Sequence, residues 1–347
     1  MIDISTHPWM SGLFGDPEIA AIFDPQAELQ RFLKIEAAWS RALGAFSDQK
    51  HAEKVARLIE TAVIAPESLK DGFAVDGVPI PALVKLLKAD IESASHPLVH
   101  AGLTSQDVMD TSLVLALSEV LNVVSERVVL LDQQLEALKL KFGAARLMAF
   151  TRMQPALETT VAVAVDRWRQ PLPRLQSDLA RAAQDIAVLQ WGGPIGTRDH
   201  PNAETLGPAF AANLGLSDSG LSWHTDRSRI TQVVNVLMGV TVATGKIGED
   251  IALMAAIGAE QITMTGGSSS AMAHKNNPVL AETLISLANY AGSLQLSLTQ
   301  AARHEGFRSG QAWTLEWLAL SQLCIVTGAG MRQAQELLAS VETLGRV

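Results

Sequence analysis

The chain has 347 residues and a formal net charge of −9 at pH 7. This length can bury a large core and would allow one to three domains. The negative charge argues against nucleic-acid binding, and it means that an anionic substrate needs a local cationic site. The single cysteine, Cys324, excludes an internal disulfide and a multi-cysteine metal site. No basic segment followed by an apolar run opens the sequence, and charged residues interrupt the most apolar windows, so we expect a cytoplasmic protein without a membrane span.

Helical periodicity dominates the sequence, and strand patterns are scarce. Hydrophobic residues make up 48% of the chain and aromatic residues 5%, which favours helix over sheet. From Asp107 to about Phe142 there is neither proline nor glycine, and apolar residues recur at steps of three and four. A helix of about 30 residues would be about 45 Å long, which predicts an all-α protein built around a long helical bundle.

Three more long helices follow, and the loops between them hold most of the unusual residues. We expect these helices over about 159–190, 228–264 and 278–303. The second of the three is apolar around much of its circumference, which predicts burial on several sides and packing between subunits. A boundary near residue 100 divides the chain into an N-terminal helical domain, 1–100, and a long central bundle, 101–347.

The loop 266–278 carries the densest set of reactive residue types. It reads Gly-Gly-Ser-Ser-Ser-Ala-Met-Ala-His-Lys-Asn-Asn-Pro. Its glycines permit backbone geometries in which successive N–H groups form an anion-binding concavity. Lys275 adds a cation, and Ser269 or Ser270 adds a hydroxyl. The combination suits an enzyme that moves a proton next to a carboxylate, whereas a bare Ser/Gly run would indicate only a mobile surface loop.

A second set of polar residues stands just before the first long helix. Thr104 and Ser105 occupy the predicted helix start, where hydroxyl groups satisfy free N–H groups. This capping role alone would explain them. The same position also favours a bound carboxylate, because the N–H groups and the dipole of the helix attract an anion. His100 adds a donor that can be charged near neutral pH.

Both segments resemble motifs of the fumarase/aspartase superfamily. Loop 266–278 resembles the signature Gly-Ser-Ser-x-Met-Pro-x-Lys-x-Asn-Pro. The matching positions are Ser269, Ser270, Met272, Lys275, Asn277 and Pro278. Two positions depart from the signature, Ser268 and Ala273. The segment before the first long helix is similar to the motif His-x-Gly-x-Thr-Ser-x-Asp, which implies that Thr104 and Ser105 bind a substrate carboxylate, with His100 alongside.

Residues 151–154, Thr-Arg-Met-Gln, take the place of the superfamily's second motif, Thr-His-x-Gln. The lyases have a histidine general acid or base at the second position, where this chain has Arg152. An arginine cannot exchange protons usefully near neutral pH, but its guanidinium can bind a carboxylate through two hydrogen bonds. The resemblance therefore implies that Thr151, Arg152 and Gln154 contact the substrate. The alternative is that Arg152 is an ordinary surface residue.

Four further segments are similar to those of the 3-carboxy-cis,cis-muconate cycloisomerase branch of the superfamily. They are 74–84, 191–197, 223–229 and 304–317. The first of them lacks the His-Asp pair that adenylosuccinate lyases usually have in this region. The third contains Arg227, a further cation that could bind a small polyanion.

The resemblance implies a homotetramer whose active sites combine segments of three subunits. It also implies lactonisation of 3-carboxy-cis,cis-muconate, a small tricarboxylate, to 4-carboxymuconolactone in protocatechuate catabolism. Ser269, with Ser270 as the alternative, would carry the proton, while Lys275 and Asn277 would stabilise the developing charge. We expect no cofactor and no metal, because no His/Asp/Glu grouping has ligand spacing and no nucleotide-binding loop is present.

Two other interpretations stay open. The same fold could carry an adenylosuccinate-type lyase, which Arg152 and the missing His-Asp pair disfavour. A non-catalytic helical oligomer could have kept the scaffold, which the retained Ser269 and Lys275 disfavour. Superfamily members usually carry a further small helical domain after the segment that corresponds to 313–339, and we expect this chain to lack most of it.

Overall fold

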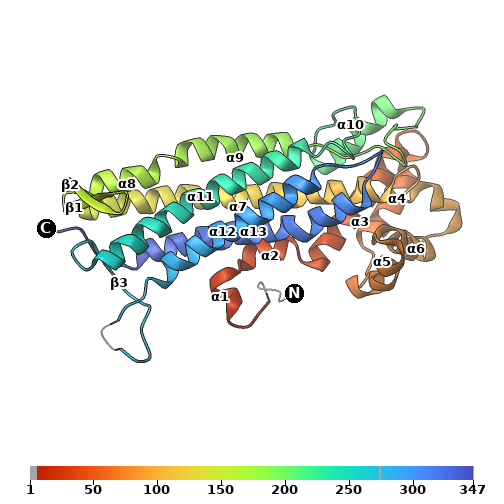
Figure 1. The fold of residues 1–347 in the computed structure, drawn as a ribbon. Helices are drawn as coiled ribbons and strands as arrows, with labels where there is room; N and C mark the ends of the chain where they lie inside the picture. The colour runs from red at the N-terminus through yellow and green to blue at the C-terminus, as the bar shows by residue number, and fades with distance from the viewer. Residues whose placement is uncertain (1–5, 273–274, 347) are drawn as a thin grey trace.

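Long helices lying side by side make up most of the molecule (Figure 1). A computed structural model describes residues 6–272 and 275–346. The bundle is formed by α7 (Ser105–Phe142), α9 (Leu172–Ile186), α11 (Ser228–Ile257), α12 (Val279–Ala301) and α13 (Gly310–Ala339). The all-α fold class is therefore confirmed. The first long helix begins two residues earlier than predicted and ends at the predicted residue.

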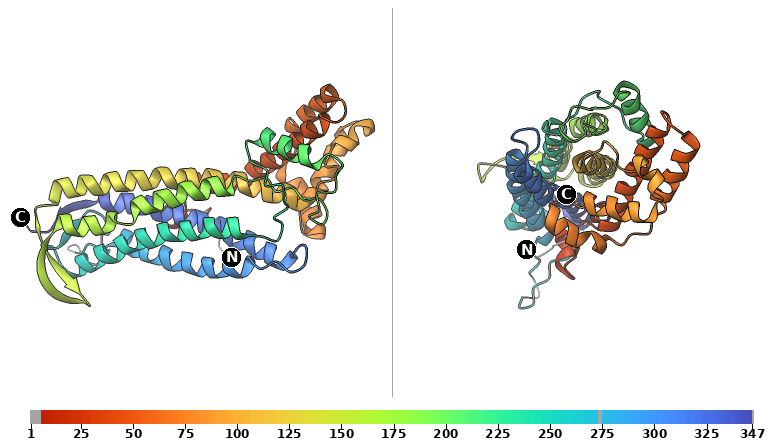
Figure 2. Two further views of the ribbon diagram at one scale, coloured as in Figure 1. Left: turned by 90° about the horizontal axis from the view of Figure 1, so that it is seen from above. Right: turned by 90° about the vertical axis from the view of Figure 1, so that its right-hand side faces the viewer.

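A smaller helical domain lies at one end of the bundle (Figure 2). Its elements are α3 (Pro25–Gly44), α4 (Gln49–Glu60), η1 (Pro66–Leu69), α5 (Lys70–Asp76), α6 (Ile80–Asp90) and η2 (Ser93–Leu98). Helix α10 (Ala203–Leu214), from far along the chain, packs on α3 and shares the same hydrophobic core. In contrast, α1 (Met10–Phe14) and α2 (Pro17–Ile22) pack on α13. The end domain thus includes residues well beyond position 100, and residues before position 25 pack on the bundle.

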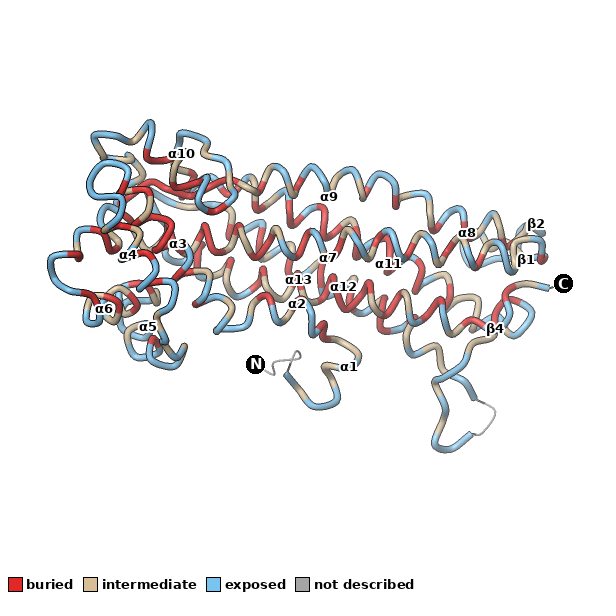
Figure 3. Tube along the Cα trace, turned by 180° about the vertical axis from the view of Figure 1, so that it is seen from behind, coloured by how far each residue is buried: buried red, intermediate tan, exposed pale blue. Residues whose placement is uncertain are grey.

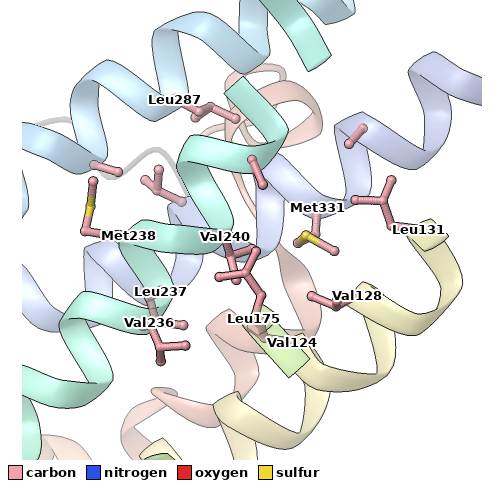
Figure 4. Packing of buried hydrophobic residues seen from close by; sticks show 14 of the residues in the cluster. Val124, Val128, Leu131, Leu175, Val236, Leu237, Met238, Val240, Leu287 and Met331 are labelled. Atoms are coloured by element: carbon pink, nitrogen blue, oxygen red, sulfur yellow. The ribbon is translucent and has the colours of Figure 1, made fainter. Parts of the chain in front are cut away.

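Apolar packing around α7 holds the bundle together. This helix has 38 residues and is about 57 Å long at about 1.5 Å per residue. Side chains from α7, α9, α11, α12 and α13 meet in one continuous core, as Figure 4 shows for Val124, Leu175, Val240, Leu287 and Met331. Buried positions follow the inward sides of the long helices (Figure 3). Each such side chain contributes roughly 1.5–3 kcal/mol when it leaves water, so the bundle is a rigid platform for its end loops.

The helix predicted over 159–190 is wrong in its extent. Strands β1 (Arg146–Thr151) and β2 (Gln154–Thr160) form an antiparallel hairpin, and α8 (Val161–Arg169) precedes α9. Pro171 separates the two helices, because a proline ring has no N–H and clashes with the preceding helical turn. The hairpin was not predicted, since most of its residues are exposed and leave no alternating apolar pattern.

The helix predicted over 228–264 also ends early, at Ile257. Gly258 has a φ of 126°, which a helical residue does not adopt. The chain then forms β3 (Ile262–Met264), which pairs with β4 (Val341–Leu344). By length and composition alone α11 could cross a membrane, but 67% of its most apolar stretch is buried inside the molecule. Burial of this kind is what a core helix has.

Candidate active site

The loop before α7 is held by three side chains of α3. Ser40 Oγ and Trp39 Nε1 donate to two backbone carbonyls of the loop, at 2.6 and 2.9 Å. Glu36 Oε1 lies 2.6 Å from His100 Nδ1. His100 itself has a φ of 59°, a left-handed conformation that is unfavourable for a residue with a side chain. Contacts from α3 therefore fix both the path of the loop and the orientation of the imidazole ring.

The environment of His100 favours its protonated form. The Glu36 side chain has no exposed surface, whereas the His100 side chain is 18% exposed. Burial alone would lower the pKa of His100, but the charge and hydrogen bond of Glu36, with the charge of Asp107, outweigh burial and raise it. Lys88 opposes them more weakly. The histidine thus stays cationic to a higher pH than a free side chain.

The start of α7 is built around Asp107. A capping box joins this residue to Thr104, whose N–H donates to Asp107 Oδ2 at 3.0 Å. Asp107 also accepts from the N–H groups of Gly192 and Gly193, at 2.8 and 2.9 Å, and its Oδ1 lies 2.8 Å from His224 Nε2. Thr104 and Ser105 stand at the helix N-terminus as predicted, next to the His100 loop. Their capping role and a role in binding an anion are compatible.

Arg227 lies inside the protein. Its guanidinium contacts both oxygens of Asp110, at 2.6 and 3.0 Å, and both oxygens of Glu316, at 2.5 and 3.0 Å. Burial lowers the pKa of Arg227, but the two carboxylates outweigh burial and raise it above its ordinary value. Sequence reasoning missed Asp110 as a partner. Because the guanidinium is already satisfied and fully buried, we leave Arg227 out of the substrate-binding set.

Residues 151–154 form the tip of the β1–β2 hairpin. Thr151 pairs with Gln154, and the two residues between them have φ values of 48° and 64°. Positive φ at both central positions defines a tight two-residue turn that matches the twist of the strands. Arg152 is exposed at this turn. The hairpin therefore presents a cation at its exposed tip.

The described parts of the loop 266–278, residues 266–272 and 275–278, also protrude from the bundle (Figure 1). Ser269 Oγ accepts from the N–H groups of Ala271 and Met272, at 3.3 and 3.2 Å. Ser270 and Lys275 are exposed, and Asn277 is half-buried at the base of the loop. Ala273, where the signature has proline, lies outside the described residues. The loop thus offers hydroxyl, ammonium and N–H groups to a ligand.

Within one chain, the start of α7, the hairpin tip and the loop 266–278 are separated from one another. His100 and Thr104 lie beside the end domain, at the start of α7, whereas the hairpin tip and the loop 266–278 lie towards the opposite end of the bundle (Figures 1 and 2). The length of α7, about 57 Å, separates the two ends. Among the described residues, no group of three His, Cys, Asp or Glu side chains is placed to hold a metal ion.

The family of the chain follows from its similarity to known proteins. The profile of the lyase family matches residues 48–291. Together with the helical bundle and the motifs at its ends, this match shows that the chain belongs to that family, within the fumarase/aspartase superfamily.

Individual relatives narrow the comparison further. The 3-carboxy-cis,cis-muconate cycloisomerase of Pseudomonas aeruginosa is 31% identical over 355 residues, which cover 99% of this chain and 77% of that protein. The crystal structure of 3-carboxy-cis,cis-muconate lactonizing enzyme from Pseudomonas putida matches with a TM-score of 0.87 and 30% identity, covering 97% of this chain and 77% of that one. The nitrosuccinate lyase of Streptomyces davaonensis is 30% identical over 277 residues, which cover 75% of this chain and 58% of that protein.

Proposed function

We propose that this chain is a cycloisomerase that converts 3-carboxy-cis,cis-muconate, or a close polyanionic analogue, to 4-carboxymuconolactone. The observation that carries the proposal is the similarity to cycloisomerases over nearly the whole chain, 99% of it for the Pseudomonas aeruginosa enzyme. The retained Ser269, Lys275 and Asn277 support it. We place the reaction in protocatechuate catabolism in the cytoplasm, as the resemblance implies.

The proposed active site combines segments from different copies of the chain. We infer that a single chain holds an incomplete site, because the β1–β2 hairpin and the loop 266–278 lie towards the end of the bundle opposite to the start of α7. Apolar side chains on the outer faces of the bundle support contact between copies. Val242 of α11, Leu296 of α12 and Leu318 of α13 are 62%, 64% and 58% exposed. We propose a homotetramer in which three copies contribute to each site.

The proposed reaction consumes one proton. One carboxylate oxygen of the trianion adds to a double bond, and the π electrons move to the carbon next to a second carboxylate. That carbon then takes a proton, so the trianion and one proton give the dianionic lactone. The loop 266–278, here called the serine loop, would stabilise the aci-carboxylate intermediate through Lys275, Asn277 and its backbone N–H groups. Ser269 would deliver the proton, with Ser270 as the alternative.

We assign substrate binding to the start of α7 and to the tip of the β1–β2 hairpin. The N–H groups at the start of α7, with Thr104 and Ser105, would hold one carboxylate beside His100. The hairpin tip would bring Arg152 to a second carboxylate, with Thr151 and Gln154 as hydrogen-bond partners.

A direct assay tests the proposed function. Purified protein should consume 3-carboxy-cis,cis-muconate, followed by its ultraviolet absorbance, without added nucleotide and after treatment with a chelator. It should not cleave adenylosuccinate or argininosuccinate. Cleavage of adenylosuccinate without lactonisation would replace the proposal by an adenylosuccinate-type lyase. A tetramer that turns over neither compound would favour the non-catalytic oligomer.

A further inference from the structure

Glu36 is an unusual residue for the inward face of α3. The side chains of Leu29, Phe32 and Leu33 on the same face are almost fully buried, and so is Glu36. One of its oxygens contacts His100 Nδ1 at 2.6 Å, and the other is buried and has no hydrogen-bond partner among the described residues. Burying a carboxylate is unfavourable unless a partner neutralises or hydrogen-bonds it, and His100 is the hydrogen-bond partner of this carboxyl group among the described residues.

We propose that Glu36 is a positioning residue that keeps the His100 imidazole doubly protonated and directs its Nε2–H towards a substrate carboxylate at the start of α7. This inference rests on the cycloisomerase function proposed above. The hydrogen bond at Nδ1 fixes the rotation of the ring, and no described residue accepts a hydrogen bond from Nε2. The second N–H is therefore left for a ligand.

The other charged groups near His100 do not replace Glu36. Asp107 of α7 also favours the imidazolium, but its oxygens already accept from Thr104 and from two glycine N–H groups, and His224 Nε2 lies 2.8 Å from one of them. Lys88 of α6 opposes protonation. Because Glu36 is hydrogen-bonded directly to His100, its removal should change the protonation state of the imidazole most.

The left-handed backbone of His100 adds a second, independent argument. A non-glycine residue with a φ of 59° is strained by about 1–3 kcal/mol, and such conformations persist only where surrounding contacts impose them. Here Ser40 and Trp39 hold the loop on either side of His100, and Glu36 holds the ring. Three adjacent side chains of α3 thus serve to present one imidazole.

A charged imidazole matters because the protein carries a net charge of −9 and the proposed substrate is a trianion. Protonated His100 prevails at pH values below its pKa, so carboxylate binding at this position should weaken as the pH rises through that pKa. Because Glu36 raises the pKa, it should move this weakening to higher pH.

The test compares the pH dependence of kcat/KM in wild type, Glu36→Gln, His100→Gln and Glu60→Gln. Glu60 pairs with Arg41 on the surface of the same domain and serves as the control. Glu36→Gln should shift the alkaline fall of kcat/KM down by about 1–3 pH units, mainly through KM, since an adjacent opposite charge moves a pKa by that amount. His100→Gln should remove this fall, and Glu60→Gln should leave it unchanged. A folded Glu36→Gln tetramer with the wild-type profile would overturn the proposal.

A second measurement does not depend on turnover. Diethyl pyrocarbonate modifies neutral imidazole, and mass spectrometry locates the modified histidine. Glu36→Gln should raise the modification rate of His100 near neutral pH by up to about tenfold for each pKa unit lost, and tricarballylate should protect His100 in wild type. If His100 is modified faster in Glu36→Gln than in wild type but wild type turns over no muconate, the proposed function fails while the Glu36 role stands. If Glu36→Gln does not fold, equal affinity of wild type and His100→Gln for tricarballylate at all pH values would overturn the role of His100.

Discussion

The Asn277 N–H donates to the Gly267 carbonyl at 2.8 Å, and this contact closes the base of the serine loop. Gly267 has a φ of 75°, and a Cβ built on it would lie 1.9 Å from the Asn277 carbonyl oxygen. The two backbone segments approach more closely than any side chain permits. The relative positions of Ser269 and Lys275 therefore depend on a glycine at 267.

Gly267→Ala should lower turnover by about 10²-fold while leaving the helix content unchanged, because a misplacement of about 1 Å near reacting groups has that effect. Gly292→Ala is the matched control, since Gly292 lies in α12 and a Cβ there meets nothing within 4 Å. Circular dichroism compares the helix content of the two variants, and steady-state kinetics compares their turnover. Equal activity of both variants would show that the loop geometry does not depend on this contact.

Ser269→Ala should reduce kcat by about 10²–10⁴, the usual contribution of a positioned proton-transfer group. The structure supplies a reason why this hydroxyl could act, because Ser269 Oγ accepts from the N–H groups of Ala271 and Met272, which would stabilise an alkoxide. Ser270→Ala is the comparison. A larger loss in Ser270→Ala than in Ser269→Ala would transfer the role to Ser270.

Lys275→Met should lower kcat by roughly 10²–10³, as expected when a cation that stabilises transition-state charge is removed. The side chain is exposed on the loop in the single chain, so the substitution should not disturb packing. Stopped-flow or steady-state assays separate kcat from KM. A change confined to KM would make Lys275 a ground-state binding residue.

Much of the fold was predictable, because the apolar repeat of α7 is uninterrupted and capped at Thr104. The bounds of α9 and α11 were harder, since Pro171 and Gly258 end helical segments that the apolar pattern alone would continue. The motifs identified the predicted site segments. They could not predict the distance between these segments, which is a property of the fold.

Glu36 carried a sequence signal that was overlooked. It follows Leu29, Phe32 and Leu33 at helical spacing, so a carboxylate stands on an apolar stripe. Its partner, His100, lies 64 residues further along the chain, and no local pattern joins the two. The Arg227 pairs with Asp110 and Glu316 were hidden for the same reason.

Arg152→Asn should raise KM by about tenfold or more with a smaller effect on kcat, since an arginine there binds a carboxylate but does not relay protons. Asparagine tolerates the left-handed conformation of this position, which has a φ of 48°, so the hairpin should be retained. Arg152→Lys keeps the charge but lacks the paired donors of the guanidinium, so its KM should lie between those of wild type and Arg152→Asn. A loss of kcat at unchanged KM would contradict a binding role.

Arg227→Met should destabilise the protein by about 3–5 kcal/mol, because it leaves Asp110 and Glu316 buried without their cation. Adding Glu316→Gln should recover part of this loss, since one of the two buried negative charges is then removed. The same charges determine how the stability loss of Arg227→Met depends on pH. Burial already raises the pKa of Glu316, and without Arg227 this carboxylate should take up a proton more easily.

The deficit of Arg227→Met relative to wild type should therefore be smaller in mildly acidic than in mildly alkaline buffer, because Glu316 takes up a proton as the pH falls. Urea unfolding at a fixed protein concentration measures the free energy of unfolding of each variant at both pH values. Arg57→Met serves as the control, because Arg57 pairs with Glu53 on an exposed helix face and its loss should change stability by less than about 1 kcal/mol. A deficit that is equal at both pH values, or no larger than that of the control, would mean that the guanidinium does not neutralise the buried carboxylates.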